Sequence, residues 1–528
     1  MRLFSVKKFR VSLLVGSALL TALTLMLPQY IGLLEWVSLV PFALVTFSFA
    51  ERGTPLKKHF LYLLLFFGVY YFAIFHFFVT MYPMEFLGIS KLAALGVVAV
   101  AWLGLTALQA IPFALAFLAL RPLGRCRAVR RCRLLFPFLA AAIWTVLEWL
   151  LTLTWAGVPW SRLALGQVKL LPLLQSASLF GSYFVTFLIV AVNFLLAYVL
   201  YYEKKKLLLV PILMFSVNLL VGGTLMLAHR DVGEAVQVAA VQGNVSSQEK
   251  WDTSRYLDNL KLQKRLTTQA VKRGADIVVW AESSFPDVLD DIPSVEEFLS
   301  GTASGGDCYL LAGAFDTDEE GNRYNSMFTF RPDGSRDDTV YNKRHLVPFG
   351  EFVPLRPLVE FFVPALADIN AANEDFTAGQ DSNVVTTEYG KLGISICFDS
   401  IYEETVRDSV RDGAELLVIA TNDSWFLHSA ALGMHNSQSV LRAVENGRWL
   451  VRAANTGISS IISPTGETVA QIGANKEWYI CEEVYMCEEL TLYSRIGNLF
   501  VLLCGIFIAF VPTYELIGHW QKKRRTTN

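Results

Sequence analysis

The sequence predicts a membrane α-helical bundle of about eight transmembrane helices that carries one α/β domain. The first observation behind this fold class is composition: 53% of the 528 residues are hydrophobic and only 17% are charged. Soluble domains usually carry about a quarter charged residues. The second observation is a change near residue 229, where long apolar runs give way to short β-rich runs alternating with amphipathic stretches. The net charge of −2 gives no indication of nucleic-acid binding.

The apolar runs reach the roughly 20 residues that a helix needs to cross about 30 Å of hydrocarbon. We expect the helices at residues 11–30, 31–50, 59–82, 92–120, 134–155, 177–200, 207–228 and 496–517. The first run follows Lys7, Lys8 and Arg10, so it could instead be the core of a signal peptide. No clear small-x-small cleavage site follows it, and we therefore favour a retained helix.

Basic residues mark every second connection between these helices. The clusters lie at the N-terminus, at Lys57–Lys58, at Arg121 to Arg133, at Lys204–Lys206 and at Lys522–Arg525. Short loops rich in Lys and Arg stay in the cytoplasm, so both termini are predicted to be cytoplasmic. The expected domains are a seven-helix bundle at 1–228, an extracytoplasmic domain at 229–495, and a final helix with a basic tail at 496–528.

Two glutamates, Glu35 and Glu148, interrupt the apolar runs. A carboxylate within a membrane is costly and is by default a functional candidate. For Glu35, an equally good interpretation is that the side chain extends to the membrane interface. Glu148 lies deeper, among Trp144, Trp149 and Trp155. We expect it either to hydrogen-bond within the bundle or to line a cleft through which lipid enters.

Residues 229–495 alternate predicted strands with predicted helices. The strands are expected at Val236–Gln242, Asp276–Ala281, Tyr309–Phe315, Tyr324–Arg331, Lys391–Phe398, Glu415–Thr421 and Trp449–Ala454. Helical patterns lie between them, for example at 252–273, 401–412 and 432–447. This alternation predicts a layered α/β domain.

Three apolar strands stop at polar residues whose presence the strand pattern does not explain. These segments are VVWAESS at 278–284, YNKRHLVPFGE at 341–351 and GISICFD at 393–399. In an open α/β sheet, the ends of the strands are where binding and chemistry are usually placed. The candidates for catalysis are therefore Glu282, Lys343 and Cys397.

These three side chains can work as a set. A cysteine thiol has a pKa near 8.5 and is mostly protonated at neutral pH, so the Glu282 carboxylate could remove its proton. The Lys343 ammonium would favour the thiolate and then stabilise a tetrahedral oxyanion, with the backbone N–H of Phe398 as a second donor. Each residue alone is weak evidence, because a lone Cys is more often a small buried hydrophobe and a lone Lys is usually solvated.

The seven cysteines include no CxxC pair, which argues against a zinc or thioredoxin-type site. Cys481 and Cys487 could pair in an oxidising compartment or remain free thiols. We expect neither a metal nor a cofactor.

The segment at 229–495 resembles the nitrilase (carbon–nitrogen hydrolase) superfamily, and the whole chain resembles its apolipoprotein N-acyltransferase family. The resemblance is carried by several motifs in order: Val241-Gln242-Gly243-Asn244 with Trp251, the YNKRHLVPFGEFVP run, Asn422-Asp423-Ser424-Trp425-Phe426, then His435, Arg442, Glu445, Arg448, Arg452 and Asn455-Thr456-Gly457, and finally Thr491 to Arg495. It implies an α-β-β-α sandwich between the seventh and eighth transmembrane helices.

The resemblance also implies roles. It makes Glu282 the general base, Lys343 the oxyanion cation and Cys397 the nucleophile. Supporting positions would be Glu351, Asp399 and Phe398, and substrate contacts would come from Trp251, Trp425, Phe426, Phe361 and Phe362. The last two, with Leu366, belong to a lid loop expected at 355–372. The sequence has Ala281 where the family usually has Pro, and Asp399 where it usually has Glu.

The implied reaction moves an acyl chain from a membrane phospholipid, through a thioester on Cys397, to the α-amine of a diacylglyceryl-modified lipoprotein. The protein is expected in the cytoplasmic (inner) membrane of a bacterium, as a monomer, with no nucleic-acid partner. One alternative is a membrane-tethered amidase with the same triad and water as acceptor. A second alternative is a catalytically silent lipid-binding membrane protein.

Overall fold

The computed structural model describes residues 7–51, 54–83, 90–362 and 375–527, and these form two compact units. The first unit, the helical bundle, contains residues up to His76, Val100–Ala228 and the chain from Ile496 onward. The second unit contains His229–Arg495 together with the short segment Phe77–Ala99.

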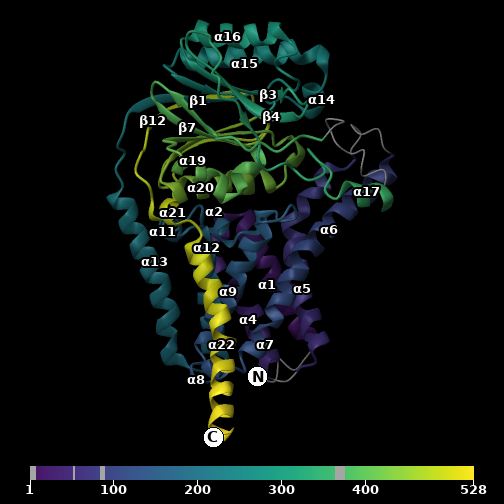
Figure 1. Ribbon diagram of the computed structural model, residues 1–528, viewed down its shortest axis with the longest axis vertical. Coiled ribbons are helices and arrows are strands. Elements are labelled where there is room, and N and C mark those ends of the chain that lie inside the picture. The colour runs from purple at the N-terminus through teal and green to yellow at the C-terminus, as the bar shows by residue number, and fades with distance from the viewer. Residues whose placement is uncertain (1–6, 52–53, 84–89, 363–374, 528) are drawn as a thin grey trace. The chain divides into compact units, whose positions relative to one another are not determined.

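Eight helices within the described ranges are long and apolar enough to cross a membrane, as predicted. They span Lys7–Met26, Pro28–Ala50, Leu56–Met81, Lys91–Leu123, Leu135–Thr152, Ser182–Tyr202, Lys205–Ala228 and Leu499–Leu516. Figure 1 labels their main parts as α1 (Lys7–Met26), α4 (Val40–Glu51), α5 (Leu56–Ile74), α6 (Lys91–Leu118), α9 (Leu135–Thr152), α12 (Ser182–Tyr202), α13 (Leu209–Ala228) and α22 (Leu499–Thr527).

Two of these helices differ from their predicted forms. The sixth was expected from 177 but begins at Ser182, because Gly181 adopts a positive φ of 82° and separates it from the short helix Ala177–Phe180. A positive φ is open to glycine and ends a right-handed helix. The second is broken near its start by the 3₁₀ turn Gly32–Leu34. A second break lies at Leu39, between the short helix Glu35–Ser38 and α4, and there the amide of Asn193 donates to Glu35 O at 2.9 Å and accepts from Leu39 N at 2.9 Å.

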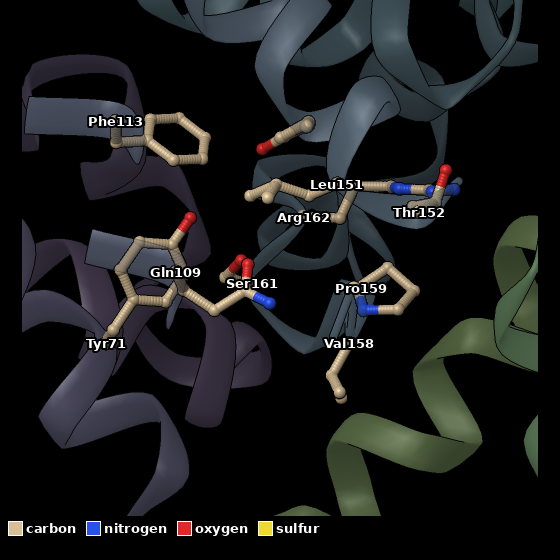
Figure 2. Close-up of a pocket in the computed structure, with 11 residues that line it drawn as sticks. Tyr71, Gln109, Phe113, Leu151, Thr152, Val158, Pro159, Ser161 and Arg162 are labelled. Atoms are coloured by element: carbon tan, nitrogen blue, oxygen red, sulfur yellow. The ribbon is translucent and has the colours of Figure 1, made fainter. Parts of the chain in front are cut away.

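The two intramembrane glutamates are both buried. Glu148 accepts hydrogen bonds from Trp144 Nε1 at 3.0 Å, Thr186 Oγ1 at 2.9 Å and Leu163 N at 3.4 Å, which confirms that it hydrogen-bonds within the bundle. It also lines a small cleft with the Arg162 side chain (Figure 2).

Glu35 has no exposed surface, and its Oε2 accepts from Gln167 Nε2 at 2.5 Å. The interpretation that Glu35 extends to the membrane interface was therefore wrong. The neighbouring Gly166 allows this burial, because a Cβ there would lie 2.1 Å from the Glu35 carboxylate.

The second unit contains two six-stranded sheets within the described ranges. The first has the order β12-β1-β2-β3-β4-β5 and the second β11-β10-β9-β8-β7-β6. The strands of the first are β1 (Ala235–Gln242), β2 (Ile277–Val279), β3 (Tyr309–Thr317), β4 (Arg323–Phe330), β5 (Tyr341–Asn342) and β12 (Trp478–Tyr485). Those of the second are β6 (Val384–Thr387), β7 (Gly390–Ile396), β8 (Leu416–Thr421), β9 (Trp449–Ala454), β10 (Ser459–Ile462) and β11 (Thr468–Ile472).

Helices cover the outer face of each sheet, which gives the expected α-β-β-α sandwich (Figure 1). Helices α15 (Tyr256–Val271) and α16 (Pro293–Gly306) lie on the first sheet. Helices α19 (Glu403–Arg411) and α20 (Ala431–Asn446) lie on the second.

The period-two pattern of the strands builds this sandwich. In β1, Val236, Val238 and Ala240 point into the core shared by the two sheets. The alternate residues Ala239 and Val241 instead pack with the core of the first sheet that includes residues of α15 and α16. Because both faces of β1 are buried, its sequence is nearly continuously apolar.

Candidate active site

The ends of three strands carry the three predicted catalytic residues. Strands β1, β2 and β3 run parallel in one sheet, as do β7, β8 and β9 in the other. Glu282 follows β2, Lys343 follows β5 directly, and Cys397 follows β7 as the first residue of the 3₁₀ turn Cys397–Ile401. Carboxyl ends of parallel strands share one edge of a sheet, so short loops bring these side chains together.

Lys343 lies between two carboxylates. Its ammonium, only 1% exposed, donates to Glu282 Oε1 at 3.0 Å and to Glu351 Oε1 at 3.0 Å. The amide of Asn325 donates to the same two oxygens, at 2.8 Å each. The second oxygen of Glu282 accepts from Asn422 N at 2.8 Å. Each carboxylate is therefore fixed by donors that favour its ionised form.

Charge separates the pKa values of the two glutamates. Burial alone would raise the pKa of Glu282, but Lys343 and Lys250 outweigh it and hold the pKa below its usual value. Burial raises the pKa of Glu351 above its usual value, with Lys343 opposing and Glu282 adding to the rise. Glu282 is therefore the carboxylate that stays ionised and free to accept a proton, and Glu351 is the group that is more easily protonated.

Cys397 sits on a strained turn and is partly buried. Its φ is +49°, a conformation that few non-glycine residues adopt, and such strain clusters at active sites. Burial raises the pKa of the Cys397 thiol and Glu282 adds to the rise, while Lys343 lowers it. The thiol is therefore protonated at rest, and it needs a base to become a nucleophile.

Asp399 joins the loops that carry Lys343 and Cys397. One of its oxygens accepts from Tyr341 OH at 2.7 Å and from Ile396 N at 3.2 Å, and the other accepts from His345 N at 2.6 Å. The supporting position predicted for Asp399 is thus structural: it contacts residues on either side of Lys343 and the residue before Cys397.

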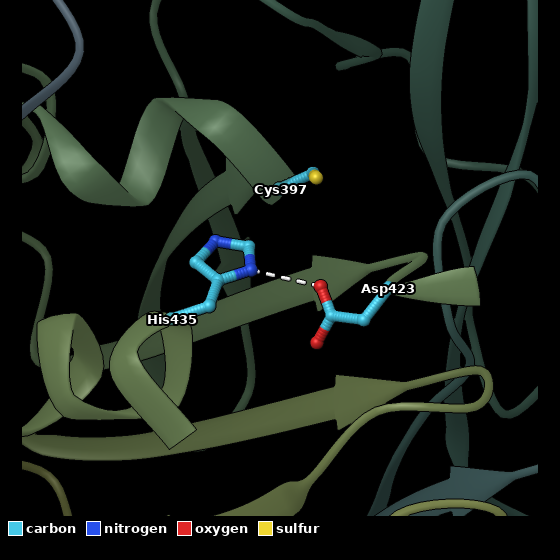
Figure 3. A group of neighbouring side chains, drawn as sticks. All are labelled: Cys397, Asp423 and His435. Atoms are coloured by element: carbon cyan, nitrogen blue, oxygen red, sulfur yellow. Dashed lines mark hydrogen bonds and ion pairs between the residues drawn. The ribbon is translucent and has the colours of Figure 1, made fainter. Parts of the chain in front are cut away.

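A second group of polar side chains lies beside the nucleophile. The Cys397 sulfur, an Asp423 oxygen and a His435 ring nitrogen all lie within 4.8 Å of one another (Figure 3). His435 Nδ1 contacts Asp423 Oδ1 at 2.8 Å, and Arg452 Nη2 donates to Asp423 Oδ2 at 3.0 Å. Thr421 Oγ1 also donates to Asp423 Oδ1, at 3.1 Å.

This trio is a poor metal site. Both Asp423 oxygens already accept hydrogen bonds, and the Arg452 guanidinium would repel a cation held there. Although burial opposes it, the neighbouring His435 and Arg452 hold the pKa of Asp423 well below its usual value. Asp423 is therefore a fixed anion that orients the His435 ring next to the sulfur.

Comparison with known proteins finds one matching family for the helical part of the chain and another for the α/β part. Residues 17–195 match the apolipoprotein N-acyltransferase N-terminal domain, and residues 237–486 match the carbon–nitrogen hydrolase family. An apolipoprotein N-acyltransferase of Geobacter metallireducens is 35% identical over 74% of this chain and 76% of its own length. One from Gloeobacter violaceus is 31% identical over 89% of this chain and 88% of its own. The chain belongs to the apolipoprotein N-acyltransferase family.

A solved structure is similar to about half of this apolipoprotein N-acyltransferase family member. Saccharomyces cerevisiae Nit3, a member of branch 10 of the nitrilase superfamily, aligns with 51% of this chain and 97% of its own, at 22% identity and a TM-score of 0.37.

The substrate contacts predicted for this family member remain predictions, but the structure places most of them. The Trp251 ring is 37% exposed and stacks on Phe315, with centroids 6.1 Å apart. Phe361, on the short helix Arg356–Phe362, is 78% exposed. The Phe362 side chain, Leu366 and most of the expected lid loop lie outside the described residues.

Trp425 and Phe426 follow β8 and contact a distant segment of the same unit. Trp425 O accepts from Thr80 Oγ1 at 3.0 Å, and the Phe426 ring meets Phe77 edge-on at 5.2 Å. Phe426 also lies 6.2 Å from the His435 ring.

Sequence reasoning missed two residues that contact Glu282. Asn325 lies inside β4, where the strand pattern alone gives no reason to single out one polar residue. Lys250 donates from Nζ to Glu282 O at 2.9 Å. The sequence gives no local signal for it, because Lys250 directly precedes Trp251, which is exposed.

Proposed function

We propose that this chain N-acylates lipoproteins, using Cys397 as nucleophile, Glu282 as general base and Lys343 as the oxyanion cation. The observation that carries the proposal is the buried Lys343 ammonium, 3.0 Å from Glu282, beside a thiol on a strained turn. Membership of the family supplies the substrates: a membrane phospholipid as acyl donor and the N-terminal diacylglyceryl-cysteine of a lipoprotein as acceptor.

The first half-reaction forms a thioester. Glu282 takes the Cys397 proton as the sulfur attacks the carbonyl carbon of a phospholipid ester. Negative charge moves to the carbonyl oxygen, where Lys343 and the Phe398 N–H stabilise it. The ester C–O bond then breaks, Glu282 gives its proton to the departing glycerol oxygen, and a lysophospholipid leaves.

The second half-reaction forms the amide. The neutral α-amine of the acceptor attacks the thioester carbon, and Glu282 takes a proton from the amine nitrogen. The C–S bond breaks, and Glu282 returns its proton to the sulfur. The enzyme regains its starting state, so the kinetics should be ping-pong. Glu351 serves throughout as the second anchor of Lys343.

The location that fits this reaction is the cytoplasmic membrane of a bacterium, with 229–495 on the outer side. The alternation of basic loops supports this orientation. A membrane-impermeant thiol reagent should label Glu320→Cys, in the exposed turn between β3 and β4, on intact spheroplasts. Native Cys132, which is exposed in the 121–133 loop, should react only after permeabilisation. The reverse pattern would overturn both the orientation and the function.

The reaction itself is tested with the purified full-length protein, a phospholipid and a diacylglyceryl-cysteine peptide. Mass spectrometry should find N-acylated peptide and lysophospholipid in equal amounts. Free fatty acid with unmodified peptide would instead support the amidase-type alternative with water as acceptor. No turnover from a well-folded protein would support the catalytically silent alternative.

A further inference from the structure

Lys250 is a buried lysine that has no direct role in the two half-reactions of acyl transfer. It ends the short helix Ser247–Lys250, is 4% exposed, and donates from Nζ to the carbonyl oxygen of Glu282 at 2.9 Å. Burying an ammonium is costly unless opposite charge compensates for it. The residue that follows, Trp251, remains partly exposed at 37%, so the chain turns Lys250 inward while it leaves the aromatic ring outside.

Charge balance gives a reason for Lys250 to be buried. Glu282 and Glu351 face the same Lys343 ammonium. Two ionised carboxylates with one cation would leave one negative charge uncompensated, and a buried site relieves that by protonating a carboxylate. Lys250 is a second cation, hydrogen-bonded to the backbone of Glu282 itself, and its charge favours the ionised form of the Glu282 carboxylate.

We propose that Lys250 is a positioning residue of the active site, which fixes the Glu282 turn and keeps the Glu282 carboxylate ionised and ready to take the thiol proton. The inference rests on the roles proposed for Glu282 and Cys397. It adds a second lysine to the Glu-Lys-Cys set, one that acts through the base rather than on the oxyanion.

The groups around Lys250 set the pH range in which its charge is available. Burial lowers the pKa of Lys250 to about 8, Glu282 and Cys397 oppose the fall, and Lys343 adds to it. Its charge is therefore present below about pH 8 and is lost above that pH. In return, Lys250 is one of the cations that lower the pKa of Glu282, after Lys343.

A purely structural role makes a different prediction. If Lys250 only tied residues 246–251 to the Glu282 turn, its loss would slow the reaction equally at every pH. If it controls the charge of Glu282, its loss should raise the pKa of Glu282. The acidic limb of the pH profile then moves to higher pH, because a higher pH is needed to ionise the base.

The experiment measures single-turnover acylation of Cys397 by phospholipid, from pH 5 to pH 10, in the full-length protein. The variants are Lys250→Met, Lys250→Gln and Lys250→Arg, with Lys261→Met as control because Lys261 is exposed on α15. Thermal melting of each variant separates misfolding from loss of charge.

We expect Lys250→Met and Lys250→Gln to move the acidic limb up by about one pH unit, which is roughly a tenfold loss below that limb. Lys250→Arg should restore the wild-type acidic limb and extend activity on the alkaline side, because arginine keeps its charge there. Lys261→Met should match the wild type.

A uniform loss across pH in the folded Met and Gln variants, or an Arg variant that resembles them, would overturn the inference. Wild-type protein that forms no thioester on Cys397 would instead overturn the proposed function, so the two failures are distinguishable.

Discussion

Glu282 and Glu148 are both buried glutamates, but their surroundings differ in kind. Glu282 is held by an ammonium at 3.0 Å, the Asn325 amide and a backbone N–H, and a second lysine binds its own carbonyl. Glu148, inside the bundle, accepts hydrogen bonds from three uncharged donors, Trp144, Thr186 and a backbone N–H, and it shares a small cleft with the Arg162 guanidinium.

The difference shows what each site can do. Paired ammonium groups keep a carboxylate ionised inside a protein, which makes it a base that is ready to accept a proton. The hydrogen-bond donors of Glu148 lie on α9, on α12 and at Leu163, so this carboxyl group joins neighbouring segments of the bundle. Burial of a glutamate is therefore not enough to indicate catalysis; what marks Glu282 is the neighbouring Cys397 thiol together with two lysines.

The largest effect on turnover should come from Glu282→Gln, and Glu148→Gln is the matched comparison. Glu282→Gln removes the base, and loss of general base catalysis costs about 10²–10⁴-fold in rate. Glu148→Gln keeps an acceptor oxygen for Trp144 or Thr186, so turnover should remain within about threefold while stability falls by about 1–3 kcal/mol. Activity assays and thermal melting check both. Equal losses of turnover in the two variants would contradict the assignment of a catalytic role to Glu282 and a structural role to Glu148.

The next effect concerns Lys343, which is proposed to meet charge that develops only in the transition state. Its loss should therefore lower kcat rather than raise KM, by about a hundred- to a thousand-fold. Lys343→Arg should also fail, because the planar guanidinium directs its donors differently. The neighbouring Arg344 is a matched control. It donates to Asp381 O at 2.7 Å, away from the carboxylates, and Arg344→Ala should be tolerated. Near wild-type kcat in Lys343→Met would refute the triad.

A smaller effect is expected for Asn325, whose amide donates to both Glu282 and Glu351. Asn325→Leu leaves two buried carboxylates short of a donor, and hydrogen bonds to charged groups contribute about 1.5–3 kcal/mol. We expect kcat/KM to fall by about 10- to 100-fold, with Lys343 still in place. Ser326→Ala, at the next position of β4, faces Asn342 instead and should have little effect. Equal losses of kcat/KM in Asn325→Leu and Ser326→Ala would contradict this role of Asn325.

The sequence predicted the membrane helices and the central strands because their signals are local. Long apolar runs are recognisable alone, and β1, β3, β8 and β9 lie within a residue or two of their predicted bounds. Strands β5, β6 and β10 to β12 were missed. The exposed and buried residues of β12 do not alternate cleanly, and it carries Glu482 and Glu483, so no clear pattern marks it as a strand.

Glu282, Lys343 and Cys397 could be singled out from the sequence because each lies at or shortly after the end of a strand. Asn325 and Lys250 could not, because their roles depend on pairing between distant parts of the chain. Lys343 N donates to Asn325 O at 2.9 Å across neighbouring strands, and this register places the Asn325 amide between two carboxylates. Only the folded chain shows that Lys250 turns inward while Trp251 stays outside.

The central claim is that Cys397 carries the acyl chain, and one measurement tests it most directly. Full-length protein is incubated with phospholipid and no acceptor, digested, and its cysteine peptides are weighed by mass spectrometry. The account predicts a hydroxylamine-sensitive long-chain acyl adduct on Cys397, lost in Cys397→Ala and in Glu282→Gln. An adduct on Cys308, Cys481 or Cys487 instead, or none in a preparation that N-acylates peptide, would contradict it.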